Sequence, residues 1–318
     1  MAIRGQDIRQ AKALLREGEL VAIPTETVYG LAGNAFNPHA VASIYEVKNR
    51  PTFNPLITHT DRLEKAAGYV QSVPPLAKKL AETFWPGPLT LLLPKATSLP
   101  DLVTAGSDLV AVRIPQHPLT LSLLQQLDFP LAAPSANPFG YISPTTAEHV
   151  SEQLGSKIAY ILDGGACSVG IESTIVGVED DTIVVYRLGG ISTEDLQQVS
   201  QRVRMHEGQR HEMPTAPGML KSHYAPARKV IIGNLSELIL RYDPERTALI
   251  SFRNLHPQIP EAHQRVLSAS GDLNEAAQQL FSALRQLDKL PVEVILAEFV
   301  PNYGLGRAIN DRLTRASA

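Results

Sequence analysis

The sequence has very little cysteine and no long apolar run. Its 318 residues include a single cysteine, Cys167, which excludes a disulfide framework and a cysteine-rich zinc site. No apolar run approaches the ~20 residues that a membrane-spanning helix needs. The first seven residues carry no apolar signal region. We therefore expect a cytoplasmic protein with no membrane partner.

The chain also lacks an excess of positive charge. Its formal net charge is -3 and its pI is about 6.3, so the composition offers no basic surface for nucleic acid. Hydrophobic residues make up 44% of the chain, which is typical of an ordinary globular protein. We expect no stable nucleic-acid binding and, at this length, two domains.

Two common nucleotide-binding motifs are missing as well. No glycine-rich run ends in Gly-Lys-Ser or Gly-Lys-Thr, and no Gly-x-Gly-x-x-Gly opens a helix. No covalent nucleophile is evident, and Cys167 is interpreted as a small packed thiol. A bound nucleotide would therefore be held by spaced cations and hydroxyls.

Helix and strand patterns alternate along the first two thirds of the chain. Apolar spacing predicts helices over residues 7–17, 37–48 and 118–127. Short apolar runs predict strands over residues 20–23, 53–59, 89–93, 109–114, 131–133, 160–163, 173–178 and 182–187. The alternation predicts an α/β fold with a mixed sheet.

The pattern changes near Met205. Residues 206–228 contain several proline and glycine breakers and predict a linker. A second α/β pattern follows, with predicted strands at 230–232, 248–252, 265–268 and 292–299, a helix at 273–287 and a terminal helix after Gly304. We therefore predict domains over 1–205 and 229–318, joined by a linker over 206–228.

Five polar segments follow apolar runs in the first domain, where ligands commonly bind. They are 24–31 (PTETVYGL), 48–51 (KNRP), 112–115 (VRIP), 134–137 (PSAN) and 172–175 (ESTI). Taken singly, 24–31 could also be a turn that caps a helix, and 134–137 could be an ordinary turn.

The charged residues of these segments leave two interpretations open. Lys48 and Arg50 suit a triphosphate, but an isolated pair is more often a pair of solvated charges that stabilise a helix C-terminus. Arg113 lies inside an apolar strand, so it needs an anionic partner, either a ligand carboxylate or an internal Asp or Glu. A histidine such as His59 is, by itself, more often structural.

Together these segments resemble the YrdC/Sua5 family of L-threonylcarbamoyladenylate synthases, and the resemblance covers nearly the whole chain. It implies a twisted mixed sheet with helices around a concave cleft, and a smaller Rossmann-like α/β domain at the C-terminus. The implied reaction condenses L-threonine, bicarbonate and ATP to threonylcarbamoyl-AMP and pyrophosphate for the t6A37 modification of tRNA. The product would pass to a separate tRNA threonylcarbamoyl-transfer machinery. Mg²⁺ would accompany ATP, and no protein side chain is predicted to bind a metal.

The resemblance also implies roles for particular residues. Lys48 and Arg50 are expected to act in catalysis. The L-threonine contacts are expected from Thr27, His59, Arg113, Ala133 and Ser173. The ATP contacts are expected from Lys48, Arg50, Asn54, Leu109, Ser135, Asn137, Ser143, Arg187 and Tyr224. Tyr224 belongs to a linker signature over 216–226, which is expected to fold over the site as a lid.

Two other classes of protein fit the sequence less well. A double-stranded RNA-binding module would show clustered Lys and Arg with interleaved aromatic residues, and the chain shows neither at scale. Hydrogenase-maturation proteins that transfer carbamoyl groups contain a related domain, but they also carry cysteine-rich zinc segments. The single cysteine excludes that zinc part.

Overall fold

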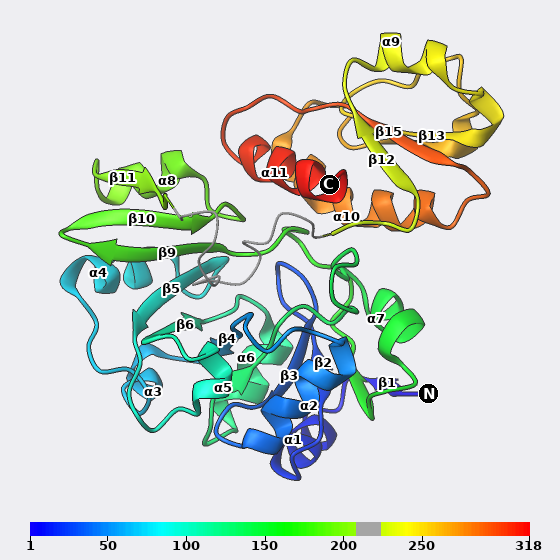
Figure 1. Ribbon diagram of the computed structural model, residues 1–318. Helices are drawn as coiled ribbons and strands as arrows, with labels where there is room; N and C mark the ends of the chain where they lie inside the picture. The colour runs from blue at the N-terminus through cyan, green and yellow to red at the C-terminus, as the bar shows by residue number, and fades with distance from the viewer. Residues whose placement is uncertain (208–223) are drawn as a thin grey trace. The chain divides into compact units, whose positions relative to one another are not determined.

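The computed structural model of the protein describes residues 1–207 and 224–318 (Figure 1). The described residues form two compact units. Residues 1–139, 144–168 and 172–207 belong to the first, and residues 140–143, 169–171 and 224–318 belong to the second. Of the linker and lid predicted over 206–228, residues 208–223 lie outside the described residues.

The first unit alternates short strands and helices around one mixed sheet, as the sequence pattern predicts. Its helices are α1 (Ile8–Arg16), α2 (Pro38–Lys48), α3 (Leu63–Ala66), α4 (Pro75–Phe84), α5 (Asp101–Thr104), α6 (Pro118–Gln125), α7 (Ala147–Leu154) and α8 (Thr193–Val199). Its strands are β1 (Ile3–Gly5), β2 (Val21–Ile23), β3 (Gly30–Asn34), β4 (Ile57–His59), β5 (Leu89–Pro94), β6 (Leu109–Arg113), β7 (Leu131–Ala132), β8 (Tyr160–Leu162), β9 (Thr174–Glu179), β10 (Thr182–Arg187) and β11 (Val203–Met205). Within the described residues, these strands form a sheet in the order β1-β8-β2-β3-β7-β4-β6-β5-β9-β10-β11.

Local signals in the sequence set the ends of α2. The Asn37 side chain accepts hydrogen bonds from the N–H groups of His39 and Ala40, and Pro38 occupies the first helical position. Asn49 then ends the helix in the left-handed conformation, with φ 52°. These signals make Lys48 the last residue of α2 and turn the chain toward Arg50.

Alternate residues of the strands face two layers of helices. On β2, Ala22 packs in a cluster with side chains of α2, α4 and α7, whereas Val21 and Ile23 pack with side chains of α1 and α6. Because both faces of the sheet are buried, its strands read as continuous apolar runs. Packing on both faces therefore fixes the positions of the strand ends, where the polar segments lie.

Some predicted strands are wrong in their extent: of the strand predicted over 292–299, only Val294–Ala297 is a strand, and the strand over 53–59 is also shorter. The sequence predicts a strand over 53–59, but β4 begins only at Ile57. Pro55 has no N–H to donate to a sheet. Arg50 also binds the preceding carbonyls, donating from Nε to Asn54 O at 3.1 Å and from Nη2 to Pro55 O at 2.8 Å. Asn54 therefore lies in a turn before the strand.

The second unit is a smaller α/β arrangement. Its main elements are β12 (Lys229–Ile232), α9 (Leu235–Leu238), β13 (Thr247–Ser251), β14 (Gln264–Val266), α10 (Leu273–Asp288), β15 (Val294–Ala297) and α11 (Gly306–Ala316), with short 3-10 turns between them. The described strands pair in parallel in the order β12-β15-β13-β14. A parallel sheet with connecting helices is what the second sequence pattern predicts.

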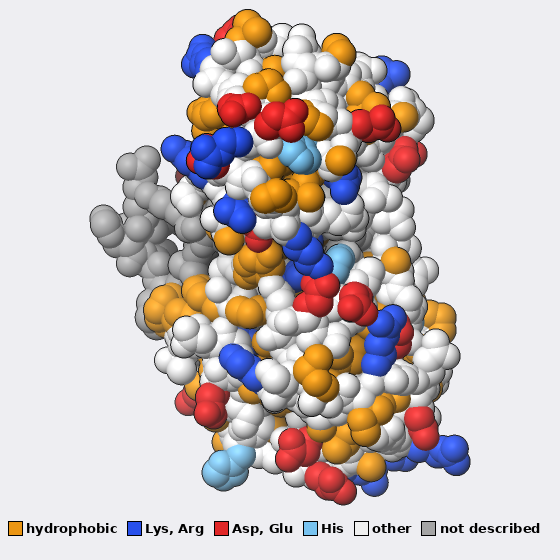
Figure 2. Space-filling view, turned by 90° about the vertical axis from the view of Figure 1, so that its right-hand side faces the viewer, with side chains coloured by type: hydrophobic (Ala, Val, Ile, Leu, Met, Phe, Trp, Pro, Cys, Tyr) orange, Lys and Arg blue, Asp and Glu red, His pale blue; other side chains and the backbone are white. Residues whose placement is uncertain are grey.

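Charges of both signs are interspersed on the surface. In the view of Figure 2, Lys and Arg side chains alternate with Asp and Glu side chains over the visible face. None of the helices in the described ranges is long and apolar enough to span a bilayer.

Candidate active site

Four strands of the first unit bring polar residues to one edge of the sheet. His59 ends β4 and Arg113 ends β6, and the parallel register pairs these two residues. Strand β5 runs antiparallel to β6 and pairs Leu91 with Val112, so the start of β5, which carries Thr90, lies at the end of β6. Strand β9 runs parallel to β5 and begins directly after Ser173. Residues far apart in the sequence therefore meet at this edge.

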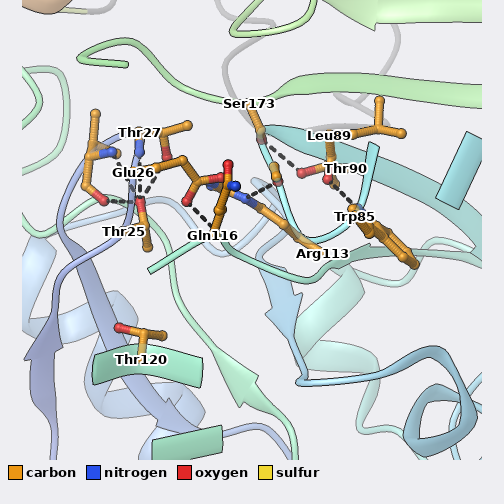
Figure 3. Close-up of polar contacts among 12 residues, drawn as sticks. Thr25, Glu26, Thr27, Trp85, Leu89, Thr90, Arg113, Gln116, Thr120 and Ser173 are labelled. Atoms are coloured by element: carbon orange, nitrogen blue, oxygen red, sulfur yellow. Dashed lines mark hydrogen bonds and ion pairs between the residues drawn. The ribbon is translucent and has the colours of Figure 1, made fainter. Parts of the chain in front are cut away.

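Arg113 has an internal anionic partner. Its Nη2 lies 2.8 Å from Oε1 of Glu26, and both side chains are nearly fully buried. Within residues 1–207 and 224–318, neither of these two atoms makes a hydrogen bond, so the contact is an ion pair without hydrogen-bond alignment. The other oxygen, Oε2, accepts a hydrogen bond from the N–H of Gln116 at 2.9 Å. Figure 3 shows Glu26 and Arg113 pointing toward one another.

Buried hydroxyl groups lie on either side of this ion pair in Figure 3. Oγ1 of Thr25 and Oγ1 of Thr27 are 2.8 Å apart, and Thr25 donates to Val28 O at 2.6 Å. On the other side, Oγ of Ser173 lies 2.7 Å from Oγ1 of Thr90. The site thus combines one guanidinium with two pairs of hydroxyls.

Arg187 supports Ser173 from the end of β10. Its Nε and Nη2 donate to Ser173 O at 3.1 and 2.9 Å, and Nη2 also donates to Ser173 Oγ at 3.1 Å. Arg187 is itself buried. The arginine therefore orients the Ser173 hydroxyl at the start of β9.

His59 is a neutral polar group in this site. Burial and the nearby charge of Arg113 lower the pKa of its imidazole to about 3. Its Nδ1 is buried and makes no hydrogen bond within the described residues. The backbone groups of Ile57 and Leu131 also interact with the ring and partly oppose this shift of the pKa.

A second group of polar residues surrounds the end of α2. The buried Lys48 donates from Nζ to the backbone oxygens of Ser135 and Asn137, each at 2.5 Å. Burial, with a smaller contribution from the charge of Arg50, lowers the pKa of Lys48 well below its usual value. Lys48 therefore ties the Ser135–Asn137 turn to the helix end.

The side-chain amide of Asn54 is fully buried in the same group. Both Nδ2 and Oδ1 lack a hydrogen-bond partner among the described residues. Unpaired buried amides are rare in folded proteins and call for an explanation. A polar ligand beside Asn54 provides one.

The remaining predicted site residues fall in other places. Ala133 continues β7 and donates its N–H to Ile57 O at 2.9 Å. Leu109 begins β6, at the opposite end of that strand from Arg113. Ser143 and Tyr224 belong to the second unit, where the ring of Tyr224 stacks on Phe281 with centroids 5.3 Å apart.

Two residues of the site have no role in the sequence interpretation. Glu26 lies within the PTETVYGL segment, four residues before Gly30 at the start of β3, and a single glutamate at this place gives little signal by itself. Thr90 lies within an apolar strand and becomes evident only through its contact with Ser173. Cys167 is buried, and burial raises the pKa of its thiol to about 12, which agrees with a packed thiol.

Two family models together match most of the chain. A model described as "Telomere recombination", Sua5_yciO_yrdC, matches residues 13–189. A model described as "Threonylcarbamoyl-AMP synthase, C-terminal domain" matches residues 191–318.

The chain is also similar to characterised relatives over nearly its full length. It is 41% identical to the threonylcarbamoyl-AMP synthase of Pyrococcus abyssi, covering 98% of this chain and 94% of that protein. It is likewise 41% identical to the enzyme of that name from Bacillus subtilis, covering 98% of this chain and 92% of that protein. The crystal structure of P. abyssi Sua5 complexed with L-threonine superposes with a TM-score of 0.92 at 39% identity, covering 100% of this chain and 97% of that one.

Proposed function

The chain belongs to the YrdC/Sua5 family, and from this we infer that it is a threonylcarbamoyl-AMP synthase, a nucleotidyl-transferring enzyme. It condenses L-threonine, bicarbonate and ATP to threonylcarbamoyl-AMP and pyrophosphate. The product then serves the N6-threonylcarbamoyl modification of tRNA. We place this chemistry in the cytoplasm, with a separate tRNA-modifying machinery as the consumer of the product.

The observation that carries the proposal is Arg113, a buried guanidinium that, among the described residues, makes one ion pair with Glu26 and one long hydrogen bond to Gly87 O. Guanidinium and carboxylate groups match in a planar fork, so Arg113 suits the carboxylate of an amino acid. The hydroxyls of Thr27 and Ser173 and the neutral imidazole of His59 supply the further polar contacts that a small polar substrate needs.

ATP is assigned to the group around the end of α2. The amide of Asn54 has donor and acceptor capacity for the nucleotide. Lys48 and Arg50 supply positive charge near the triphosphate, and Lys48 also fixes the turn that carries Ser135 and Asn137. Arg187 is proposed as a further nucleotide contact and Ala133 as a further threonine contact. The nucleotide contacts expected from Leu109, Ser143 and Tyr224 stay predictions from the sequence.

The reaction requires the protein to position the reactants and to balance charge, and it requires no covalent catalysis. The threonine amine first combines with bicarbonate to form a carbamate, with loss of water. A carbamate oxygen then attacks the α-phosphorus of ATP, and pyrophosphate leaves. Holding both reactants in place contributes most of the rate, and the cations offset the charge that develops on pyrophosphate.

Mg²⁺ is proposed to enter with ATP, bound to phosphate oxygens, and to shield the charge of the triphosphate. Among the described residues, no group of three or more His, Cys, Asp or Glu side chains could hold a metal ion. No step above depends on a metal bound by this chain.

Pyrophosphate release from ATP by the purified protein tests the proposed function. We expect release only when L-threonine and bicarbonate are both present, together with a product of the mass of threonylcarbamoyl-AMP. Reactions that omit either substrate serve as controls. A folded protein that releases no pyrophosphate in the complete mixture, or that releases it equally without threonine, would contradict the assignment.

Asn54→Ala is expected to separate function from stability. The substitution removes two buried polar atoms that have no partner among the described residues, so the free energy of unfolding should change by less than about 1 kcal/mol. The KM for ATP should rise by about tenfold, the scale of one or two lost hydrogen bonds. Denaturant unfolding and steady-state pyrophosphate release measure the two effects, with the exposed Asn302→Ala as control. A large loss of stability with an unchanged KM would show that Asn54 is structural.

A further inference from the structure

Glu26 is the buried carboxylate of the site, and the proposed function assigns it no role. It follows β2, lies between Thr25 and Thr27 in the chain, and is only 3% exposed. Its Oε2 accepts the N–H of Gln116 at 2.9 Å, while its Oε1 lies 2.8 Å from Nη2 of Arg113. The carboxylate is therefore fixed by the backbone that follows β6 and faces the guanidinium (Figure 3).

The ion pair leaves the hydrogen-bond donors of Arg113 available. Nη2 is in contact with Oε1 but makes no hydrogen bond. The guanidinium makes one long hydrogen bond, from Nε to Gly87 O at 3.4 Å, and within residues 1–207 and 224–318 Nη1 makes none. A guanidinium carries five N–H donors. Glu26 thus balances the charge of Arg113 while most of these donors remain for another anion.

The balance of charge explains why the arginine can stay buried before substrate arrives. A buried cation with no counter-ion is strongly unfavourable and would draw in another partner or move toward water. His59, which the register places beside Arg113, is neutral and supplies no negative charge. In the part of the chain that the structure describes, Glu26 is the one carboxylate that forms an ion pair with Arg113. A group already held in its binding geometry loses less freedom when the ligand binds.

We propose that Glu26 is a positioning residue for L-threonine: it holds the Arg113 guanidinium at the binding place of the threonine carboxylate and leaves its N–H donors to that carboxylate. The inference rests on the proposed function. Because Glu26 and Thr27 are adjacent in the β2–β3 loop, the same ion pair also sets the distance between the Thr27 hydroxyl and Arg113.

Glu26→Gln tests this role. Glutamine keeps an oxygen that can accept the hydrogen bond from the Gln116 N–H. The substitution removes only the negative charge. In pyrophosphate-release assays we expect the KM for L-threonine to rise by about tenfold or more, the scale of a lost charge-assisted contact. The KM for ATP should stay within about twofold of wild type, because ATP does not depend on Arg113.

The matched control is Glu19→Gln, an exposed glutamate seven residues earlier, which should behave as wild type. Should Glu26→Gln not fold, Glu26→Asp takes its place: the charge is kept, but the carboxylate lies one methylene farther from Arg113, and the same threonine-selective rise in KM is expected. An unchanged KM for threonine, or equal rises for threonine and ATP, would overturn the inference while the function stands. A wild-type protein without threonine-dependent turnover would reject the function and the inference together.

Discussion

Replacing Arg113 with glutamine is expected to lower kcat/KM for L-threonine by about 10²- to 10³-fold, the scale for removing one partner of a buried charge pair. The physical reason is that glutamine has neither the charge nor the planar fork that matches a carboxylate. Pyrophosphate release at varied threonine and saturating ATP measures the effect. The matched control is Arg9→Gln, whose side chain is 90% exposed and should leave activity unchanged.

The same substitution is expected to destabilise the fold through Glu26. With Arg113 gone, Glu26 is left buried and unpaired, which costs about 3–5 kcal/mol of unfolding free energy. The double variant Glu26→Gln/Arg113→Gln removes both charges and should regain most of that stability but none of the activity. Denaturant unfolding compares the variants. A double variant no more stable than Arg113→Gln would show that the ion pair does not account for the loss.

Lys48→Met is expected to have the second largest effect. Methionine fills a similar volume but cannot donate to Ser135 O and Asn137 O, which both accept from Lys48 at 2.5 Å. Relief from burying the ammonium group partly offsets the loss of these two hydrogen bonds, so we expect a net loss of about 1–3 kcal/mol of unfolding free energy. Activity should fall by about 100-fold, because the turn that carries Ser135 and Asn137 is no longer held and a cation is lost from the nucleotide site.

The pattern of binding separates this role of Lys48 from a general loosening of the fold. Titration calorimetry should show weaker ATP binding by Lys48→Met and an unchanged affinity for L-threonine measured without ATP. Lys78→Met, whose side chain is 63% exposed on α4, is the matched control. Equal losses for the two substrates would contradict a role confined to the nucleotide side.

Sequence patterns predicted the elements that have strong local signals. Asn37 and Pro38 at the start of α2 and Asn49 at its end are capping residues, and the structure confirms a helix between them. The strand over 53–59 was wrong in extent because Pro55 interrupts it and Arg50 binds two of its carbonyls. The short strand β1 carries no periodicity and is recognised only through its parallel pairing with β8.

In the candidate site too, some features are visible in the sequence and others only in the structure. Its residue types, such as arginine in an apolar strand and hydroxyls at strand ends, are visible in the sequence. Whether Arg113 has an internal partner was open on sequence alone, because Glu26 lies 87 positions earlier in the chain. The pairing of Ser173 with Thr90 is equally hidden, since it depends on β5 and β9 running side by side.

The α/β class and the set of polar residues can be read from the sequence, since they depend on local propensity and on spacing along the chain, and the family is indicated by the resemblance of the polar segments. The tertiary structure decided which of those residues meet: the Glu26–Arg113 ion pair, the Lys48 contacts with the Ser135–Asn137 turn, and the unpaired amide of Asn54. The two contacts join residues far apart in the chain, which only the strand order and the register bring within hydrogen-bond distance. The Asn54 amide has no partner among the described residues because of where the fold buries it.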